Sequence, residues 1–529
     1  MKNLNLKDNY LPILIGFTAA LSFIAWYISW KNNLVLVYND SMSHLNISRL
    51  VIDNKQPGLS QLGSVWLPFS HILTLPLIWI DSAWRSGLAG SLFSMLAYIV
   101  TVVSVHGITW EITKKRVASI LAALVAALNI NLLYLQSTPL TEVLYVALFS
   151  SSVYFLIKYL ITSKTQYLLP LTFLTTLQMM TRYDGWFFAF TTVLILIGFE
   201  VYIRKQEISK ALGSVAVYIV PVVFTALLWL GYNFVLFGDP LYFASGPFSA
   251  RSQQDAIEAS AGLITKHNIA TSSETMGLTI GHTVGWFVLL IGVIGWLAYL
   301  NPWNSEGGNR LKLIVFIGLS SVIVFNVLAL FMGFSIINIP ELNWNPFDPN
   351  VARYFNVRYG VMAIPFVAAG VGLLSSKWKH ITPLLITIVV LQSALTLIER
   401  PISLLDGLYG ASSYRHQDIA EQLKTNVKPD QDVLLSFSSF PAAVHQSNLH
   451  LDQYIHEGVS EQWNDTLKQP ETNAEWILLS GSNPADQVYD ALIRKQNSKF
   501  LDSYKLVYES ENGRLYRRND VASKQASLD

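Results

Sequence analysis

Long apolar runs alternate with short polar segments over the first 400 positions. A bilayer core of about 30 Å requires roughly 20 apolar residues in a helix, and about eleven runs approach that length. The pattern therefore predicts an α-helical polytopic membrane body over residues 1–400. The predicted spans lie near residues 11–30, 86–110, 117–136, 140–161, 167–183, 185–203, 211–236, 283–303, 311–335, 359–376 and 380–398.

Two apolar runs need separate treatment. Residues 11–30 follow two lysines, as in a signal peptide, but the run is too long and ends in Trp-Lys-Asn-Asn without a small-residue cleavage site. We therefore expect an uncleaved anchor. Residues 65–80 contain two prolines and are followed by Asp81. They are expected to form a juxtamembrane or re-entrant helix.

Positive charge predicts the orientation, because cytoplasmic loops are enriched in Lys and Arg. Of the 23 Lys and Arg residues before position 400, 14 fall in short connections on the same side as the N-terminus. This predicts a cell membrane (plasma or inner membrane) protein with a cytoplasmic N-terminus. Three long loops, near 31–85, 237–282 and 336–358, then lie outside, and long outer loops are where function concentrates.

Charge density rises after residue 400. Of 71 charged residues, 31 lie in 400–529, and the whole chain is only 13% charged and 52% hydrophobic. Strand-like and helix-like runs alternate in this tail, so residues 401–529 are predicted to form a small extracytoplasmic α/β domain. The expected strands are 432–439, 475–481, 504–510 and the hairpin return 513–518, and the expected helices are 418–426 and 485–496.

Composition also excludes several functions. The net charge is +1 and no basic block is present, so nucleic acid is not implied as a partner. The chain has no cysteine, which excludes disulfides, thiolate metal sites and cysteine nucleophiles. The tail contains no phosphate loop.

The first outer loop carries Asp40 and His44, which would share one face of a helix. The pair could act as an acid–base unit or ligate a divalent ion. Alternatively, Asp40 caps the helix and His44 is a polar surface residue. His71 is more typical of an interfacial histidine than of a ligand.

Other candidates stand at the outer ends of predicted spans. Glu142 begins one span, where it either complements the helix N-terminus or faces a cavity as a second carboxylate. Arg182 and Asp184 join two spans and could pair. Arg353 and Arg358 precede a span that descends from the outer face, a position suited to binding an anion or to interfacial anchoring.

Taken in order, these residues resemble the GT-C superfamily of membrane glycosyltransferases, nearest to the protein O-mannosyltransferase and lipid A aminoarabinose transferase branch. The matching features are the first-loop acid Asp40, the Pro-containing stretch WLPFSHIL, Arg85, Glu142 and Arg358. The usual first-loop Asp-Glu is replaced here by Asp-Ser. The WWDYG motif of oligosaccharyltransferases is absent, so transfer of a whole glycan to asparagine is not expected.

The resemblance implies transfer of one sugar from a polyprenyl-phosphate donor to a glycan, lipid or protein acceptor, with inversion at the anomeric carbon. Asp40 and Glu142 are then the catalytic carboxylates, Arg358, Arg182 and Arg353 bind the donor phosphate, and His44 and His71 are accessory. No cofactor is implied, and no metal is required, although Asp40 and His44 leave a divalent ion open. Two alternatives remain: a membrane polysaccharide polymerase or ligase, and a transporter.

Overall fold

The computed structural model describes residues 10–63, 65–246, 249–301, 309–342, 344, 354–480 and 486–519. The chain folds into two compact units. Unit 1 comprises residues 1–35, 91–242 and 254–410, and unit 2 comprises residues 36–90, 243–253 and 411–529.

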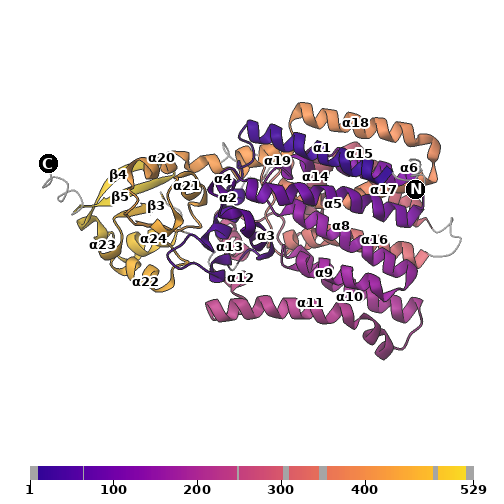
Figure 1. Ribbon diagram of the computed structural model, residues 1–529, viewed down its shortest axis with the longest axis horizontal. Helices are drawn as coiled ribbons and strands as arrows, with labels where there is room; N and C mark the ends of the chain where they lie inside the picture. Colours follow the sequence, from indigo (N-terminus) through magenta and orange to yellow (C-terminus); the bar gives the residue numbers. More distant parts are fainter. Residues whose placement is uncertain are drawn as a thin grey trace, which may run out of the picture. The chain divides into compact units, whose positions relative to one another are not determined.

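Unit 1 is helical, and its long helices run alongside one another (Figure 1). Eight described helices are long and apolar enough to cross a membrane, which confirms a multi-pass membrane protein. Their principal segments are α1 (Tyr10–Lys31), α5 (Leu88–Thr113), α8 (Glu142–Thr162), α10 (Asp184–Gly198), α11 (Ile208–Phe237), α16 (Asn309–Phe331), α17 (Ile364–Lys377) and α18 (Thr382–Glu399).

Two predicted spans are shorter than expected. Residues 117–136 divide into α6 (Arg116–Ala127) and α7 (Ile130–Leu135), because the Asn129 side chain accepts a hydrogen bond from the Leu132 amide and so begins a new helix. Residues 167–183 give only α9 (Leu168–Met179), which ends before the turn that carries Arg182. Residues 65–80 form the short helix α3 (Phe69–Ile78) in unit 2, in keeping with a non-spanning segment.

A sharp bend lies at the start of the predicted span 283–303, and the helix before it, α14 (Ile269–Val284), occupies the end of the predicted loop 237–282. Helices α14 and α15 (Trp286–Leu300) meet at 112°. Gly285 lies between them with φ +97, a conformation that residues with a Cβ rarely adopt. The Thr283 carbonyl at this bend accepts bonds from Asn129 and Asn131 Nδ2 at 2.9 and 3.0 Å, as a membrane interior requires of exposed backbone groups.

Helix α17 forms the centre of unit 1. Of the span that contains it, 94% is buried, whereas α18 and α11, at opposite edges in Figure 1, are mostly exposed. Helix α15 packs closely against α17: a Cβ on Gly295 would lie 1.8 Å from the Gly370 carbonyl oxygen. Small residues allow such close approach between membrane helices.

Unit 2 contains a five-stranded sheet in the order β2-β1-β3-β5-β4. Strand β1 pairs in parallel with β2 and β3, while β3, β5 and β4 pair antiparallel. The predicted α/β tail is therefore confirmed, including the hairpin. The strands are β1 (Val433–Leu434), β2 (Tyr454–Ile455), β3 (Trp476–Leu479), β4 (Tyr504–Ser510) and β5 (Gly513–Arg518).

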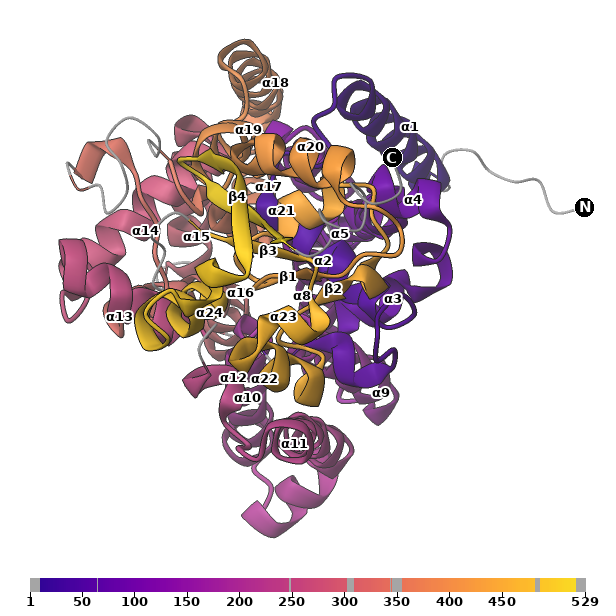
Figure 2. The same ribbon diagram turned by 90° about the vertical axis from the view of Figure 1, so that its left-hand side faces the viewer.

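Helices cover both faces of this sheet (Figure 2). Alternate strand residues point to opposite sides: Trp476 and Leu478 join one apolar core, and Ile477 and Leu479 join the other. The first core contains α20 (Gln417–Asn426) and α21 (Pro441–Gln446), and the second contains α22 (Ser460–Lys468) and α24 (Gln487–Tyr489).

The first outer loop belongs to the same unit as the tail. Its helices are α2 (Asn39–Leu50), α3 and α4 (Asp81–Arg85). Leu45, Leu50, Ile78 and Trp84 from this loop share one apolar core with α20 and α21. Loop and tail, although more than 300 positions apart in sequence, are therefore a single folded body.

Candidate active site

Two arginines in unit 1 meet one carboxylate. Glu142 is the first residue of α8, and Arg358 lies in the 3₁₀ segment η6 (Val357–Ala363) that leads into α17. Arg358 Nε donates to Glu142 Oε1 at 3.0 Å, and Arg182 Nη1 donates to the same oxygen at 3.3 Å. Glu142, Arg182 and Arg358, selected separately from the sequence, therefore form one cluster.

A second carboxylate completes the cluster. Arg182 Nε donates to Asp184 Oδ2 at 3.1 Å, so the predicted pairing of these two residues is confirmed. Asn326 of α16 donates to Asp184 Oδ1 at 3.1 Å. Two arginines then balance two carboxylates, as burial requires, since an unpaired charge in such a place costs several kcal/mol.

The two guanidinium groups differ in accessibility. The Arg358 side chain is 3% exposed and the Arg182 side chain 17%. Both lie near the Tyr359 ring, with Cζ at 5.5 Å and 4.9 Å from its centroid. Glu142 Oε2 is buried and has no hydrogen-bond partner among the described residues. Of the two arginines, Arg182 is therefore the one that a ligand can reach more directly.

Asp40 stands in the first turn of α2, in unit 2. The N-cap of this helix is Tyr38, whose backbone is extended and whose side chain makes no capping hydrogen bond. The helix-cap interpretation of Asp40 is therefore wrong, because the helix begins one residue earlier, at Asn39. Asp40 as a whole residue is half-buried.

His44 and His71 form a buried pair. His44 Nδ1 and His71 Nε2 are 2.9 Å apart, and Trp66 lies against His44 with ring centroids at 4.3 Å. Burial holds the pKa of His71 well below its usual value, and the neighbouring His44 acts in the same direction. The surface interpretation of His44 is wrong, because helices α2 and α3 pack against each other here and bury both histidines. The interfacial interpretation of His71 stays a prediction.

A metal site would need more ligands than this pair. Within the described ranges, no group of three or more His, Asp or Glu residues is placed to hold a metal ion. His44 Nδ1 already contacts His71. A metal ion bound by Asp40 and His44 could therefore use only the other ring nitrogen of His44, Nε2.

Comparison with known proteins agrees with this architecture. A model of the dolichyl-phosphate-mannose-protein mannosyltransferase family matches residues 83–229. A structure of ArnT from Cupriavidus metallidurans, bound to undecaprenyl phosphate, aligns with TM-score 0.55 at 12% identity, over 95% of this chain and 97% of that one. The Archaeoglobus fulgidus oligosaccharyltransferase in complex with zinc and sulfate aligns with TM-score 0.53 at 11% identity, over 96% and 73%.

The chain has the GT-C fold. The superfamily predicted from the sequence is thereby confirmed at the level of the fold. The archaeal enzyme AglB, also from Archaeoglobus fulgidus and in complex with an inhibitory peptide and a dolichol-phosphate, aligns with TM-score 0.50 at 10% identity, over 90% of this chain and 70% of that one. No curated protein sequence matches the chain.

Within this GT-C chain, the remaining sequence candidates have different outcomes. Arg353 lies outside the described residues. Arg85 donates to the carbonyls of His445 and Leu449 at 2.8 and 3.1 Å, and its Cζ lies 4.2 Å from the Trp84 ring centroid. Arg85 therefore connects the first loop to the tail.

Sequence reasoning missed Asn326 and Tyr359. Tyr359 follows Arg358 directly, but adjacency in sequence does not reveal that its ring also faces Arg182. Asn326 is an isolated amide in the apolar run 311–335. A buried polar residue in a membrane helix is a functional candidate by default, so Asn326 carried a detectable signal.

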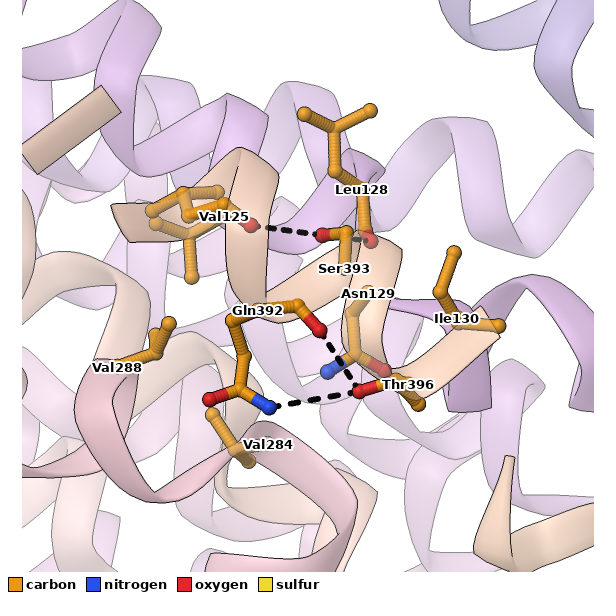
Figure 3. A pocket seen from close by; sticks show the side chains of 10 residues that line it. Val125, Leu128, Asn129, Ile130, Val284, Val288, Gln392, Ser393 and Thr396 are labelled. Atoms are coloured by element: carbon orange, nitrogen blue, oxygen red, sulfur yellow. Dashed lines mark hydrogen bonds between the residues drawn. The ribbon is translucent and has the colours of Figure 1, made fainter. Parts of the chain in front are cut away.

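A small pocket lies elsewhere in unit 1, beside the break between α6 and α7 (Figure 3). Ser393 Oγ from α18 donates to the Leu128 carbonyl at 2.7 Å. Gln392 and Thr396 also line the pocket, and Gln392 Nε2 lies 3.5 Å from Thr396 Oγ1. The space holds about one water molecule, and no residue of the arginine cluster lines it, so it is not a sugar site.

Proposed function

We propose that the chain transfers a single sugar from a polyprenyl-phosphate-linked donor to an acceptor on the extracytoplasmic face, with inversion at the anomeric carbon. The observation that carries this proposal is the cluster of Arg182 and Arg358 around Glu142. It supplies paired guanidinium groups at the start of membrane helices, where the phosphate of a lipid donor would lie.

The more exposed Arg182 is the first contact for the donor phosphate. A guanidinium presents its N–H groups as a planar fork that matches phosphate geometry. Arg358 lies behind it, joined through Glu142 Oε1. In this proposal Glu142, predicted as a catalytic carboxylate, positions the two arginines, because a carboxylate bridging two cations is a poor proton acceptor.

Asp40 is the proposed base. The acceptor oxygen or nitrogen attacks the anomeric carbon and its proton passes to the Asp40 carboxylate. The bond between that carbon and the phosphate oxygen breaks with its electron pair, so the lipid phosphate departs with an additional negative charge. Positioned cations stabilise that charge. One carboxylate suffices, since phosphate is already a good leaving group, whereas a glycosidase needs two.

Known relatives support the choice of a lipid donor. The ArnT structure contains undecaprenyl phosphate, and the AglB structure contains a dolichol-phosphate. The family matched over residues 83–229 takes its name from mannosyl transfer from dolichyl phosphate to protein. That segment includes Glu142 and Arg182. A glycan, lipid or protein hydroxyl or amine is the proposed acceptor.

The test is turnover of undecaprenyl-phosphate sugars by the purified full chain in lipid nanodiscs, measured as release of undecaprenyl phosphate. Arg182→Ala and Arg358→Ala should weaken donor use by about 1.5–3 kcal/mol, roughly 10–150-fold in kcat/KM, and the lysine variants should fall between. Arg204→Lys is the matched control. Arg204 pairs with buried Glu200 at the other end of the α10 span, so this variant should keep full donor use.

If the Ala and Lys variants of Arg182 and Arg358 all keep wild-type donor use, compared at the same concentration of folded protein, the proposed phosphate site is contradicted. Failure to release undecaprenyl phosphate from any sugar donor in a panel of hexoses and pentoses, with any acceptor class, would contradict the transferase itself.

A further inference from the structure

Helix α2, which carries the proposed base, makes side-chain contacts on two opposite faces. A helix turns 100° per residue, so positions 40, 44 and 48 lie on one side and positions 42 and 46 on nearly the opposite side. Each face contacts a different partner within unit 2. The face with Asp40 contacts α3, and the other contacts α21 of the tail.

The first face is joined to α3 by two side-chain pairs. His44 contacts His71 at 2.9 Å, and Thr74 Oγ1 donates to Ser48 Oγ at 2.8 Å. All four residues come from the first outer loop. The loop alone therefore fixes one side of α2.

The opposite face is held by the tail. Asn46 Nδ2 donates to the Pro441 carbonyl at 2.9 Å, and His445 Nδ1 lies 2.9 Å from Asn46 Oδ1. Gln446 Nε2 also contacts Met42 Sδ at 3.5 Å. Asn46 is fully buried and His445 is 3% exposed. These bonds are therefore shielded from water and fix the direction of α2 relative to α21.

The network assigns the proton on His445. The Asn46 amide nitrogen is committed as a donor to Pro441, so its oxygen is an acceptor, and His445 Nδ1 must donate. Burial lowers the pKa of His445 to about 4. The histidine is thus neutral near pH 7. Its Nε2 lies 3.4 Å from the Arg85 carbonyl oxygen, a longer contact than the 2.9 Å from Nδ1 to Asn46, so Nδ1 is the better-placed donor.

Further bonds hold the loop against the tail around this contact. Lys55 Nζ lies 2.8 Å from Asp432 Oδ1, and Arg85 donates to the His445 carbonyl itself. The shared apolar core of α2, α4, α20 and α21 lies beneath them. Helix α21 therefore holds the middle of α2, and the tail also holds its start, where the Asn39 amide donates to the Ala411 carbonyl at 2.8 Å.

We propose that His445 is a positioning residue for the transfer reaction: by donating to Asn46, the C-terminal α/β domain holds α2 from the side opposite Asp40 and so sets the orientation of that carboxylate. This rests on the proposed function, in which Asp40 is the base. The C-terminal domain is thereby part of the catalytic apparatus.

The test compares two amide substitutions at His445 in the full chain. His445→Asn places its amide nitrogen where Nδ1 lies and keeps the bond to Asn46, whereas His445→Gln places it one carbon further out. We expect kcat to remain within about threefold for His445→Asn and to fall roughly 10–100-fold for His445→Gln and His445→Ala, since a misplacement of about 1 Å can cost 10²-fold. The KM for undecaprenyl-phosphate sugar should stay unchanged in all three.

A second measurement separates positioning from general loss of structure. In an Asp40→Asn background, His445→Ala should lower turnover no further, because there is no base left to position. His456→Ala is the matched control. His456 is about as buried as His445 but contacts Asn54, which lies after the end of α2. The kcat of this variant should therefore stay near that of wild type. Thermal unfolding of each variant then tests whether it is folded.

Equal kcat for the Asn and Gln variants, or an additive loss in the Asp40→Asn background, would overturn the positioning role. A full rate in Asp40→Asn alone would instead overturn the proposed function, whatever His445 does.

Discussion

Replacing Glu142 with Gln should make the protein less stable and the anion site stronger. Glu142 Oε1 accepts from both arginines, and its side chain is 2% exposed. The Gln side chain keeps the shape and one acceptor oxygen but removes the charge. Arg182 then keeps Asp184 as its counter-ion, whereas Arg358 loses the carboxylate that binds its Nε.

The magnitude follows from burial and charge. Removing one partner of a buried ion pair costs about 3–5 kcal/mol, and the retained acceptor oxygen reduces this to about 2–4 kcal/mol. The formal charge of the four-residue cluster changes from zero to +1. At an effective dielectric constant near 20 and a separation of about 5 Å, removing one negative charge favours a bound anion by up to ~3 kcal/mol.

The assay is thermal unfolding of the purified chain in nanodiscs, with and without undecaprenyl phosphate or inorganic phosphate. Without ligand, Glu142→Gln should unfold several degrees below wild type. Undecaprenyl phosphate should raise its midpoint more than that of wild type, with at least tenfold tighter apparent binding. A response to undecaprenyl phosphate but not to inorganic phosphate would indicate that the lipid tail contributes to binding.

Glu200→Gln provides the control. Glu200 is fully buried and bonds Arg204 and Tyr159 in the same unit, so its loss should lower stability by a similar amount without changing the response to phosphate. The reasoning is refuted if Glu142→Gln matches wild type in both stability and ligand response, or if Glu200→Gln strengthens phosphate binding to the same degree.

Three further predictions concern the base, the topology and pH. Asp40→Asn should lower turnover by roughly 10²-fold or more while the protein still folds, and an undiminished rate in the release assay would remove Asp40 from the mechanism. A reporter that is active only outside the cytoplasm should work when fused after residue 529 and stay silent within 204–210; the reverse pattern would place Asp40 in the cytoplasm. Unit 2 should lose stability as the pH falls from 6.5 toward 4, because burial lowers the pKa of His445 to about 4 while the unfolded chain takes up the proton near 6.5. His445 alone contributes about 2 kcal/mol of this loss at pH 5, and the pH dependence of chemical denaturation should differ between wild type and His445→Asn by that amount.

The membrane helices could be predicted from sequence because one physical requirement dominates them: an apolar stretch long enough for the bilayer. That requirement does not locate breaks. The division at Asn129 depends on a side chain capping a new helix and donating to Thr283, 154 positions away, and no local pattern encodes such a contact.

The candidate site shows the same division between local and distant information. Glu142, Arg182 and Arg358 each stood out as a charge at the end of an apolar run, but their convergence on one oxygen depends on how α8 packs against η6. The alternative that His44 is a surface residue was wrong, because a partner 27 positions away, His71, is invisible in the sequence. The roles of Asp40 and of the arginines, the orientation and the domain boundary at residue 400 stay predictions.

The shared body of first loop and tail also determines the order in which the protein can mature. Residues 36–90 leave the ribosome early, whereas α20 and α21, which complete their apolar core, follow more than 300 positions later. At a synthesis rate of 5–20 residues per second, α20 follows the first loop after roughly 20 s to a minute.

Throughout that interval Leu45, Leu50 and Trp84 lack the α20 and α21 side chains that complete their core, and exposed apolar surface of this kind favours aggregation. A chain that stops near residue 400 would contain the eight described helices that are long enough to cross a membrane, but its first loop would lack the α20 and α21 side chains of the shared core. Residues 411–519 are therefore required to complete the apolar core of the first loop, which carries Asp40.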